Sequence, residues 1–271
     1  MNPEEYERLA SIDREHWFYR GKREIVRHWI DRTLDLGRDD LLIDAGCGTG
    51  TFLVEMAARC QVLGLDDFAE SVTLARPRVE AVGGEVLQTG LDRVELPGGC
   101  AAVVTLLDVL EHLDDDAGAL DEMLRLVRAG GVVVITVPAL RWLWSDWDEA
   151  LHHRRRYHRS DLAALCTRPG AELVHLAYFN SLALPAIAAV RALRRLAPGR
   201  SGSGGRMEDN IPPAPLNTLL RSAMVAPACW RWPRPPLGVS LLAVLRRVEP
   251  GRQGPLRVSD PSSQEIGGQF A

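Results

Sequence analysis

An alternating run of glycines follows the first strongly apolar stretch of the chain. Gly46, Gly48 and Gly50 come directly after Leu41–Ala45. Because glycine has no β-carbon, such a turn lets the backbone fold tightly and approach a ligand closely. The spacing is G-x-G-x-G, whereas the dinucleotide-binding fingerprint requires G-x-G-x-x-G, and Thr51 stands where that fingerprint has its third glycine. The turn therefore predicts a ligand site at the end of a strand.

A carboxylate ends the second apolar stretch, Val62–Leu65. This residue is Asp66, and Asp67 follows it directly. An acidic side chain at the tip of the second strand can accept both hydroxyls of a ribose, so the glycine turn and this strand together predict a nucleoside site. Asp66 is favoured by its position, and Asp67 is the alternative.

Short apolar runs alternate with longer amphipathic stretches between residues 39 and 137. The apolar runs predict strands over Leu41–Ala45, Val62–Leu65, Glu85–Leu87, Ala101–Leu107 and Val132–Val137. The amphipathic stretches predict helices over Thr51–Arg59, Ala69–Val82 and Asp116–Arg128. Strands that are apolar on both faces and alternate with helices indicate a parallel sheet covered on both sides. The fold class is α/β, a doubly wound Rossmann-like sheet of seven strands with an amino-terminal helix.

The second half of the chain departs from this alternation. A helix opened by Ser160 and a strand over Leu173–Phe179 precede an insertion, and the strand Val239–Val248 completes the sheet. The insertion contains apolar helices over Leu182–Leu196 and Leu216–Trp230, joined by a linker rich in Gly, Ser and Pro over Pro198–Pro215. We divide the chain into a helical cap 1–38, a core 39–179 with a lid segment 139–159, an insertion 180–236, a last core strand 237–250 and a disordered tail 251–271.

Composition excludes several classes of protein. The 271 residues are 46% hydrophobic and 25% charged, which is ordinary for a globular chain and unlike a disordered, collagen-like or polytopic membrane protein. The five cysteines are scattered without a C-x-x-C pair, so neither a disulfide framework nor a thiolate zinc site is expected. Met1–Arg20 lacks the pattern of a signal peptide, and we expect a cytoplasmic protein.

Charge is unevenly distributed along the chain. Residues 1–190 carry 20 Arg and Lys against 31 Asp and Glu, and residues 191–271 carry 12 against 5. The basic end favours an anionic partner, such as lipid headgroups or a phosphorylated substrate, although a compositional bias toward arginine explains it equally, since Lys22 is the only lysine. Residues 182–197 are too short to span a membrane, but apolar residues beside Arg191, Arg194 and Arg195 predict peripheral membrane contact, with packing on the core as the alternative.

The chain resembles the class I S-adenosylmethionine-dependent methyltransferases, and among them the methyltransferase type 11 group. The matching segments are I-D-A-G-C-G-T-G-T-F at 43–52, V-L-G-L-D at 62–66, D-R-V-E-L-P at 92–97, V-V-T-L-L-D-V-L-E-H-L at 103–113 and L-R-L-V-R-A-G-G-V-V-V-I-T-V-P at 124–138. The resemblance implies S-adenosylmethionine as cofactor. It places the methionine part against Asp44, Gly46, Cys47, Gly48 and Gly50, the ribose on Asp66, the adenine near Leu91 and Asp92, and the adenine and sulfonium side against Leu107 and Asp108. The family's aromatic residue and Asp-Phe-Asp after Leu-Pro are replaced here by Gly98-Gly99-Cys100-Ala101-Ala102, which weakens the adenine wall.

Aromatic and basic residues outside these segments predict the acceptor side. Trp17 and Tyr19 near the start, and Trp144, Arg155, Arg156 and Tyr157 after the fifth strand, resemble a bacterial methyltransferase subgroup and are the candidate substrate-binding residues. An aromatic segment that follows a strand bordering the cofactor crevice is typical of an acceptor wall or lid. Two alternatives stay open: Trp142, Trp144 and Trp147 cap the end of the sheet, and the arginines pair with Asp146, Asp148 and Glu149.

His112 and His153 are the candidate catalytic residues. Methyl transfer from a sulfonium depends mostly on alignment, and a base is needed only for a hydroxyl or carbon acceptor, a task that imidazole suits near neutral pH. The alternative for His112 is a role in shaping the pocket. No metal site is expected, because Asp114, Asp115 and Asp116 at a helix start point in different directions.

These observations predict a methyltransferase that acts on a small-molecule, glycan-precursor or lipid-linked acceptor. Nucleic acid is not an expected partner, because the first 190 residues are acidic and no binding module is present. Two other classes remain open. A nicotinamide-dependent oxidoreductase would share the strand, turn and helix, but this chain lacks the glycine spacing and the Tyr-x-x-x-Lys of that class. A non-catalytic S-adenosylmethionine-binding protein would keep the glycine turn and Asp66 without an open acceptor pocket.

Overall fold

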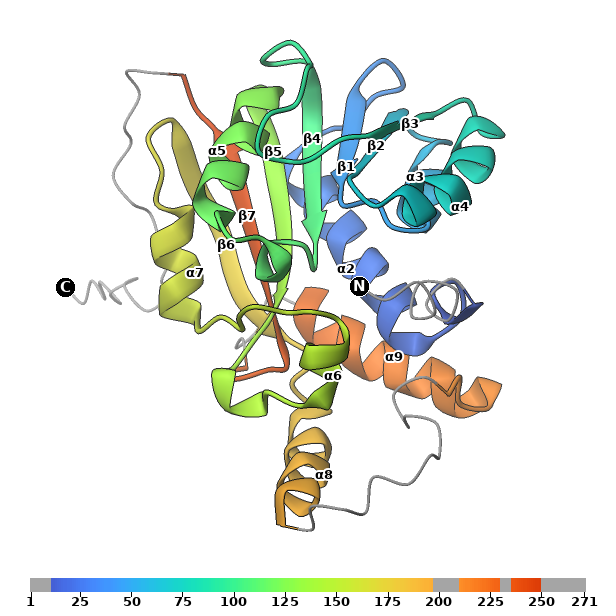
Figure 1. The fold of residues 1–271 in the computed structure, drawn as a ribbon, viewed down its shortest axis with the longest axis vertical. Helices are drawn as coiled ribbons and strands as arrows, with labels where there is room; N and C mark the ends of the chain where they lie inside the picture. Colours follow the sequence, from blue (N-terminus) through green and yellow to red (C-terminus); the bar gives the residue numbers. More distant parts are fainter. Residues whose placement is uncertain (1–10, 197–209, 230–234, 250–271) are drawn as a thin grey trace, which may run out of the picture.

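Seven strands form one sheet in the computed structural model, which describes residues 11–196, 210–229 and 235–249 (Figure 1). The strands lie in the order β3-β2-β1-β4-β5-β7-β6. Their bounds are Leu41–Ala45 (β1), Gln61–Asp66 (β2), Glu85–Gln88 (β3), Ala101–Leu107 (β4), Val127–Pro138 (β5), Ala171–Phe179 (β6) and Ser240–Arg247 (β7). Adjacent strands pair in parallel from β3 to β5, whereas β7 pairs antiparallel with both β5 and β6. The predicted doubly wound α/β fold is confirmed, with one antiparallel strand that the apolar pattern did not reveal.

Alternating side chains of the strands build a core on each face of the sheet. Ile43 packs on one side with residues of α5 and α7, and Leu42 packs on the other side with α2, α3, α4 and α9. The helices are Trp17–Thr33 (α2), Thr51–Met56 (α3), Ala69–Glu80 (α4), Asp116–Leu126 (α5), Asp146–Ala150 (α6), Arg159–Cys166 (α7), Leu184–Leu196 (α8) and Ala214–Cys229 (α9), with short 3-10 turns at Leu110–His112 and Arg141–Leu143. Burial on both faces explains why the strand sequences are almost continuously apolar.

Several predicted boundaries shift. The helix predicted to open at Ser160 begins at Arg159, because the His158 side chain accepts a hydrogen bond at the cap and Asp161 completes a capping box. The fifth strand, β5, starts at Val127 rather than Val132. Helix α3, predicted over Thr51–Arg59, ends at Met56. The predicted tail 251–271 and most of the linker Pro198–Pro215 lie outside the described residues. Within the described part of the chain, no helix combines the length and the apolar character needed to cross a membrane.

The predicted insertion separates β6 from β7 and returns one of its helices to the start of the chain. Helix α9 packs along α2, as the orange and blue helices in Figure 1 show. The side chain of Asn217 makes two hydrogen bonds there: its Oδ1 accepts from the Trp17 amide at 2.8 Å, and its Nδ2 donates to the Glu15 carbonyl at 2.8 Å. Elements about two hundred residues apart in the sequence therefore meet beside the carboxyl ends of the central strands.

We predict that Asn217→Ala weakens the attachment of α9 to the amino-terminal segment. The substitution removes both partners of the backbone groups of Glu15 and Trp17, at a partly exposed position, and should lower the free energy of unfolding by about 1–2 kcal/mol. Urea unfolding measures the change, with Ser222→Ala on an exposed part of α9 as control. Equal stability of the two variants would contradict this account.

Candidate functional site

A cavity of about 1060 Å³ lies at the carboxyl ends of β1, β2 and β4. Parallel strands present their carboxyl ends at one edge of a sheet, which is where open α/β sheets bind ligands. The predicted cofactor residues that line the cavity are Asp44, Gly46, Cys47, Gly48, Asp66, Asp67, Leu91, Leu107 and Asp108. Gly50 and Asp92 are not among the lining residues. The sequence therefore identified most of this wall, with two exceptions.

The glycine turn joins β1 to α3 in a conformation that glycine favours. Gly46, Gly48 and Gly50 have φ angles of 75°, 53° and 71°. A β-carbon on Gly48 would meet nothing within 4 Å, so the backbone of this residue borders open space in the cavity wall. A β-carbon on Gly50 would lie 2.7 Å from Val79 of α4. Gly50 is thus required for close packing of the turn on α4, and the prediction that it contacts the cofactor finds no support in its position.

Asp66 closes the turn from the second strand. Its Oδ2 accepts a hydrogen bond from the Gly48 amide at 2.9 Å, and its Oδ1 accepts one from the Phe68 amide at 3.0 Å. Burial raises the pKa of this carboxyl to about 6, against the effect of these two bonds. The two strongest features of the sequence are therefore in direct contact at the edge of the cavity.

Asp44 is the most deeply buried carboxyl of the glycine-turn wall. It lies within β1, is 3% exposed, and accepts a hydrogen bond from the Thr105 hydroxyl at 2.5 Å. Burial is the main cause that raises the pKa of Asp44 to about 7, while Thr105 and the charge of Lys22 favour the ionised form. Asp44 is thus poised to ionise when a cation or hydrogen-bond donor enters the cavity.

Helix α2 contributes a cation that the sequence reasoning did not assign to the site. Lys22 Nζ lies 2.7 Å from Asp108 Oδ2, and the Thr136 hydroxyl donates to Asp108 Oδ1 at 2.9 Å. Burial disfavours ionisation of Asp108, but Lys22 and these hydrogen bonds outweigh it and hold the pKa of the carboxyl below its ordinary value. Asp108 has a φ of 59°, so the backbone turns sharply where β4 ends. The pair joins the helical cap to the central strand across the cavity.

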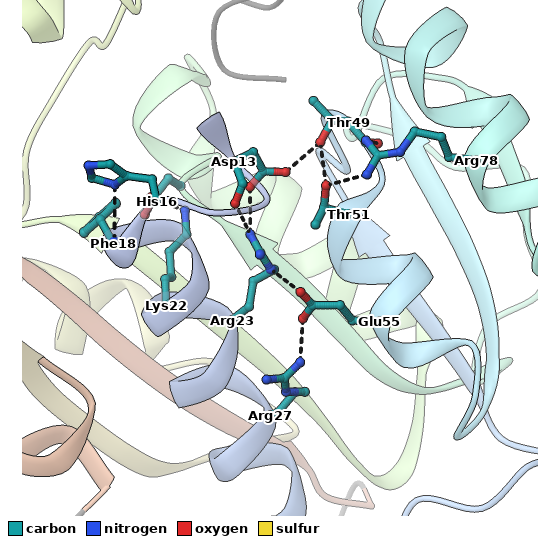
Figure 2. Close-up of polar contacts among 11 residues, drawn as sticks. Asp13, His16, Phe18, Lys22, Arg23, Arg27, Thr49, Thr51, Glu55 and Arg78 are labelled. Atoms are coloured by element: carbon teal, nitrogen blue, oxygen red, sulfur yellow. Dashed lines mark hydrogen bonds and ion pairs between the residues drawn. The ribbon is translucent and has the colours of Figure 1, made fainter. Parts of the chain in front are cut away.

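A second polar network fastens the amino-terminal segment to the glycine turn (Figure 2). Asp13 accepts hydrogen bonds from the Thr49 hydroxyl at 2.8 Å and from the Arg23 guanidinium at 2.8 Å. Arg23 also donates to Glu55 of α3 at 2.9 Å. Arg78 of α4 donates to the Thr49 carbonyl at 2.7 Å from the other side. Because these charged bonds converge on the turn, they fix its position relative to α2.

The two candidate catalytic histidines lie close together in the wall of the cavity. The rings of His112 and His153 lie 4.8 Å apart between centroids, nearly perpendicular, and both residues line the cavity. His153 Nδ1 lies 2.9 Å from Asp148 Oδ1. Burial, and then the neighbouring His153, lower the pKa of His112 to about 4. The structure therefore brings together two histidines that the sequence separates widely.

The predicted substrate-binding residues divide into two groups. Trp17, Tyr19 and Arg156 line the cavity, whereas Trp144, Arg155 and Tyr157 do not. The Tyr157 hydroxyl donates to Asp116 at 2.7 Å, and the Arg155 guanidinium lies 2.9 Å from the same carboxyl. These residues stabilise the packing of segment 139–159, and their assignment to an acceptor wall finds no support in their positions.

The alternative that the arginines of this segment pair with its acidic residues holds for Arg156. Arg156 donates from Nε to Asp148 Oδ1 at 2.6 Å and from an amino group to the Ala139 carbonyl at 3.0 Å. Its charge is therefore balanced within the same segment although it lines the cavity. Among the arginines of this run, Arg154 pairs with Asp114 rather than with an acidic residue of its own segment.

Helices α8 and α9 extend the cavity with apolar side chains. The residues that they and the segments beside them contribute are mostly apolar, namely Leu182, Ala183, Ala186, Ile187, Val190, Arg191, Asn210, Pro212, Leu216, Leu220, Ala223 and Met224. Arg191, expected on a membrane-facing surface, is only 7% exposed and lines this part of the cavity. The side chains of Arg194 and Arg195 lie outside the described residues. The insertion thus forms a wall of the site.

Comparison with known proteins gives a family match. The model of a family described as "Methyltransferase domain" matches residues 18–176. A probable S-adenosylmethionine-dependent methyltransferase of Mycolicibacterium smegmatis is 30% identical over 170 residues, which are 61% of this chain and 63% of the relative. A ubiquinone biosynthesis O-methyltransferase of Sodalis glossinidius is 31% identical over 146 residues, which are 49% and 58% of the two chains. The chain thus spans about three fifths of these curated relatives.

Solved structures share the fold at low sequence identity. The geranyl diphosphate C-methyltransferase of Streptomyces coelicolor A3(2), solved with Mg²⁺, geranyl diphosphate and S-adenosyl-L-homocysteine, has a TM-score of 0.55 and 16% identity. That likeness covers 82% of this chain and 78% of the other. It covers a larger share of the chain than the family match does.

We predict a pH dependence of stability that originates at Asp44. Its pKa is raised in the folded state, so its contribution to stability is complete below about pH 4, the ordinary range of an aspartate, and is lost as the pH rises through about 7. Asp44→Asn should therefore remove a decline on the order of a few kcal/mol between pH 4 and 7.5. Urea unfolding across this range checks the difference, and Asp39→Asn controls for the loss of a carboxyl. A parallel decline in wild type and Asp44→Asn would contradict the assignment.

Proposed function

The chain belongs to the methyltransferase-domain family, and from this premise we propose that it transfers a methyl group from S-adenosylmethionine to an acceptor with an extended apolar portion. The observation that carries the proposal is the hydrogen bond between the Gly48 amide and the Asp66 carboxylate at the edge of a cavity of about 1060 Å³. Ligand pockets for a single drug-sized molecule measure roughly 300–1,000 Å³. Two ligands side by side are therefore compatible with the volume.

The residues present fit the cofactor. Asp66 retains acceptor capacity beyond its two backbone bonds and is suited to the ribose hydroxyls, with Asp67 beside it. The backbone at Gly48 admits close approach of the methionine part, and Asp44 at the same wall is suited to a cationic amino group. We assign Leu91 and Leu107 to the adenine, because both side chains line the same cavity. These assignments rest on the family premise and on the positions of the side chains.

The reaction asks for alignment more than for acid–base chemistry. When bound, S-adenosylmethionine supplies a methyl group on a sulfonium, which departs as a neutral thioether. The acceptor atom forms a bond to the methyl carbon as the carbon–sulfur bond breaks, so holding the two partners in line supplies most of the acceleration. The contacts of Lys22 with Asp108 and of Asp13 with Thr49 hold the amino-terminal segment beside the glycine turn, and so fix the wall on which we expect the cofactor to be aligned. His112 and His153 face the acceptor side, where a hydroxyl or carbon acceptor loses a proton.

The acceptor class is inferred from α8 and α9. Their apolar side chains favour a lipid-linked or other hydrophobic small molecule over a glycan precursor, because sugar hydroxyls would lose their water without gaining partners. Arg191 lines the same part of the cavity, so this wall also carries a guanidinium group. The name of one curated relative, a ubiquinone biosynthesis O-methyltransferase, agrees with this inference.

The two other classes raised by the sequence are disfavoured by this arrangement. A non-catalytic binder has no need of a chamber beyond the cofactor, and a nicotinamide-dependent enzyme requires a lysine for its Tyr-x-x-x-Lys pair, whereas Lys22 is held by Asp108. Peripheral membrane contact through residues 182–197 stays a prediction. The exposed Leu182 and Leu193 agree with it, while Arg191 faces the cavity and is not available to lipid.

Cofactor binding tests the first part of the proposal. Asp66→Ala removes the acceptor for the ribose hydroxyls and should weaken S-adenosylmethionine binding by about 1.5–3 kcal/mol, which is roughly 10- to 150-fold. Isothermal titration with S-adenosylmethionine, S-adenosylhomocysteine and NADH measures this, with Asp39→Asn as control. Tight binding of NADH without binding of the sulfonium, or an unchanged dissociation constant in Asp66→Ala, would overturn the assignment.

Filling the part of the cavity lined by α8 and α9, here called the apolar chamber, tests the proposal that the acceptor is apolar. Ala223→Trp places a large ring in the chamber wall and should weaken binding of geranyl diphosphate, used as an apolar anionic probe, by at least about tenfold through steric overlap. Ser222→Trp, at the exposed neighbouring position, is the matched control. Both variants should retain wild-type affinity for S-adenosylmethionine. Equal effects of the two tryptophans on probe binding would show that the chamber does not hold the acceptor.

A further inference from the structure

Glu111 has a buried carboxyl group whose oxygens lack a hydrogen-bond partner in the described part of the chain. Its exposure is 0%, and neither Oε1 nor Oε2 has a hydrogen-bond partner among the described residues. Glu111 nonetheless belongs to the lining of the cavity. Burying an acidic group without hydrogen bonds is costly, so native structures keep such groups where a cation or a ligand compensates them. The side chain is therefore a candidate ligand for a cation.

His153 is oriented toward this carboxylate by a residue behind it. The Nδ1 atom of His153 lies 2.9 Å from Asp148 Oδ1, and Asp148 also receives the Arg156 guanidinium at 2.6 Å. With Asp148 ionised, Nδ1 carries the proton, so the lone pair is on Nε2, which lies 3.9 Å from Glu111 Oε1. A carboxylate that holds one ring nitrogen while the other faces outward is the usual support of a metal-binding histidine.

His112 completes a set of three donors. Its ring lies 4.8 Å from that of His153 between centroids, and both residues line the cavity. One donor atom from each of Glu111, His112 and His153 lies within 4.8 Å of the others. Donors at about 2.0–2.2 Å from one tetrahedral ion lie about 3.3–3.6 Å apart, so rotation of the side chains has to shorten the present separations for all three to bind one ion.

We propose that Glu111, His112 and His153 bind a divalent transition-metal ion of the zinc class beside the acceptor. Two imidazoles and one carboxylate suit Zn²⁺ or Co²⁺ and disfavour Mg²⁺, which prefers six oxygen ligands. Three protein ligands leave a coordination position open, as in catalytic sites, and all three residues line the cavity. The inference rests on the proposed function in one respect: the open position would hold a hydroxyl or carbonyl oxygen of the acceptor.

This assignment changes the expected role of the histidines. With an ion bound, their nitrogen lone pairs are used as ligands, and they act on the acceptor through the ion instead of taking its proton. Lys22 leaves the carboxylate available, because it is already paired with Asp108, and Arg156 is paired with Asp148. Among these nearby groups, each cation has its own carboxylate, and Glu111 is the carboxylate that a metal ion would neutralise.

Metal titration of the full chain tests the proposal. The protein is stripped with a chelator, and binding of Zn²⁺, Co²⁺ and Mg²⁺ is measured by calorimetry and by the visible absorption of the Co²⁺ complex. We expect one equivalent of Zn²⁺ or Co²⁺, no comparable binding of Mg²⁺, and at least about tenfold weaker Zn²⁺ binding in both Glu111→Gln and His153→Gln. Glu149→Gln, at an exposed position of the same segment, should bind as wild type does.

Each contrary outcome overturns the site. Absence of stoichiometric binding would leave the histidines as candidate bases. Equal binding in all variants would place the ion elsewhere in the chain, and a thiolate absorption band from Co²⁺ would assign it to cysteine. The affinity for S-adenosylmethionine is measured on the same samples. Retention of that affinity shows that a variant is folded. If wild type binds the cofactor but no metal ion, the metal site has failed; if wild type does not bind the cofactor, the proposed function has failed.

Discussion

The hydrogen bond from the Gly48 amide to the Asp66 carboxylate is the constraint on which the site depends. It joins the turn after β1 to the tip of β2, and it requires parallel strands in register, because only then do the two carboxyl ends lie at the same height. The same bond leaves the glycine backbone facing open space. A single pairing between neighbouring strands thereby sets both the shape of the wall and the position of its negative charge.

Charged contacts around this hydrogen bond hold the glycine turn and helix α2 in fixed positions relative to each other. Lys22 reaches Asp108 from one side, and Asp13 with Arg23 reaches Thr49 and α3 from the other, so helix α2 is held at two points across the cavity. These groups are largely buried, where a charge without a partner is unfavourable. Their mutual pairing therefore favours one position of the helix over others.

The insertion between β6 and β7 gives the cavity its different chemical character. Its helices α8 and α9 bring an apolar wall to a site whose other walls carry carboxylates, and α9 is fastened to α2 through Asn217. Cofactor and acceptor are consequently expected on walls of opposite polarity. The buried Glu111 and the two histidines line the same cavity and belong to the segments that follow β4 and β5.

The amino-acid sequence alone predicted the fold class, most strand positions, the glycine turn and its partner Asp66. A strand that is buried on both faces consists of apolar residues, and a turn with no room for a β-carbon requires glycine, so both features are visible in residue type. It did not reveal that β7 runs antiparallel, that Gly50 serves packing on α4, that Tyr157 and Arg155 bind Asp116, or that Arg191 turns inward. Nor did it join Lys22 to Asp108, or Glu111 to His153. Such pairs are decided by tertiary structure, since a charged side chain has the same type whether its partner is water, a neighbour on the same loop or a residue far along the chain.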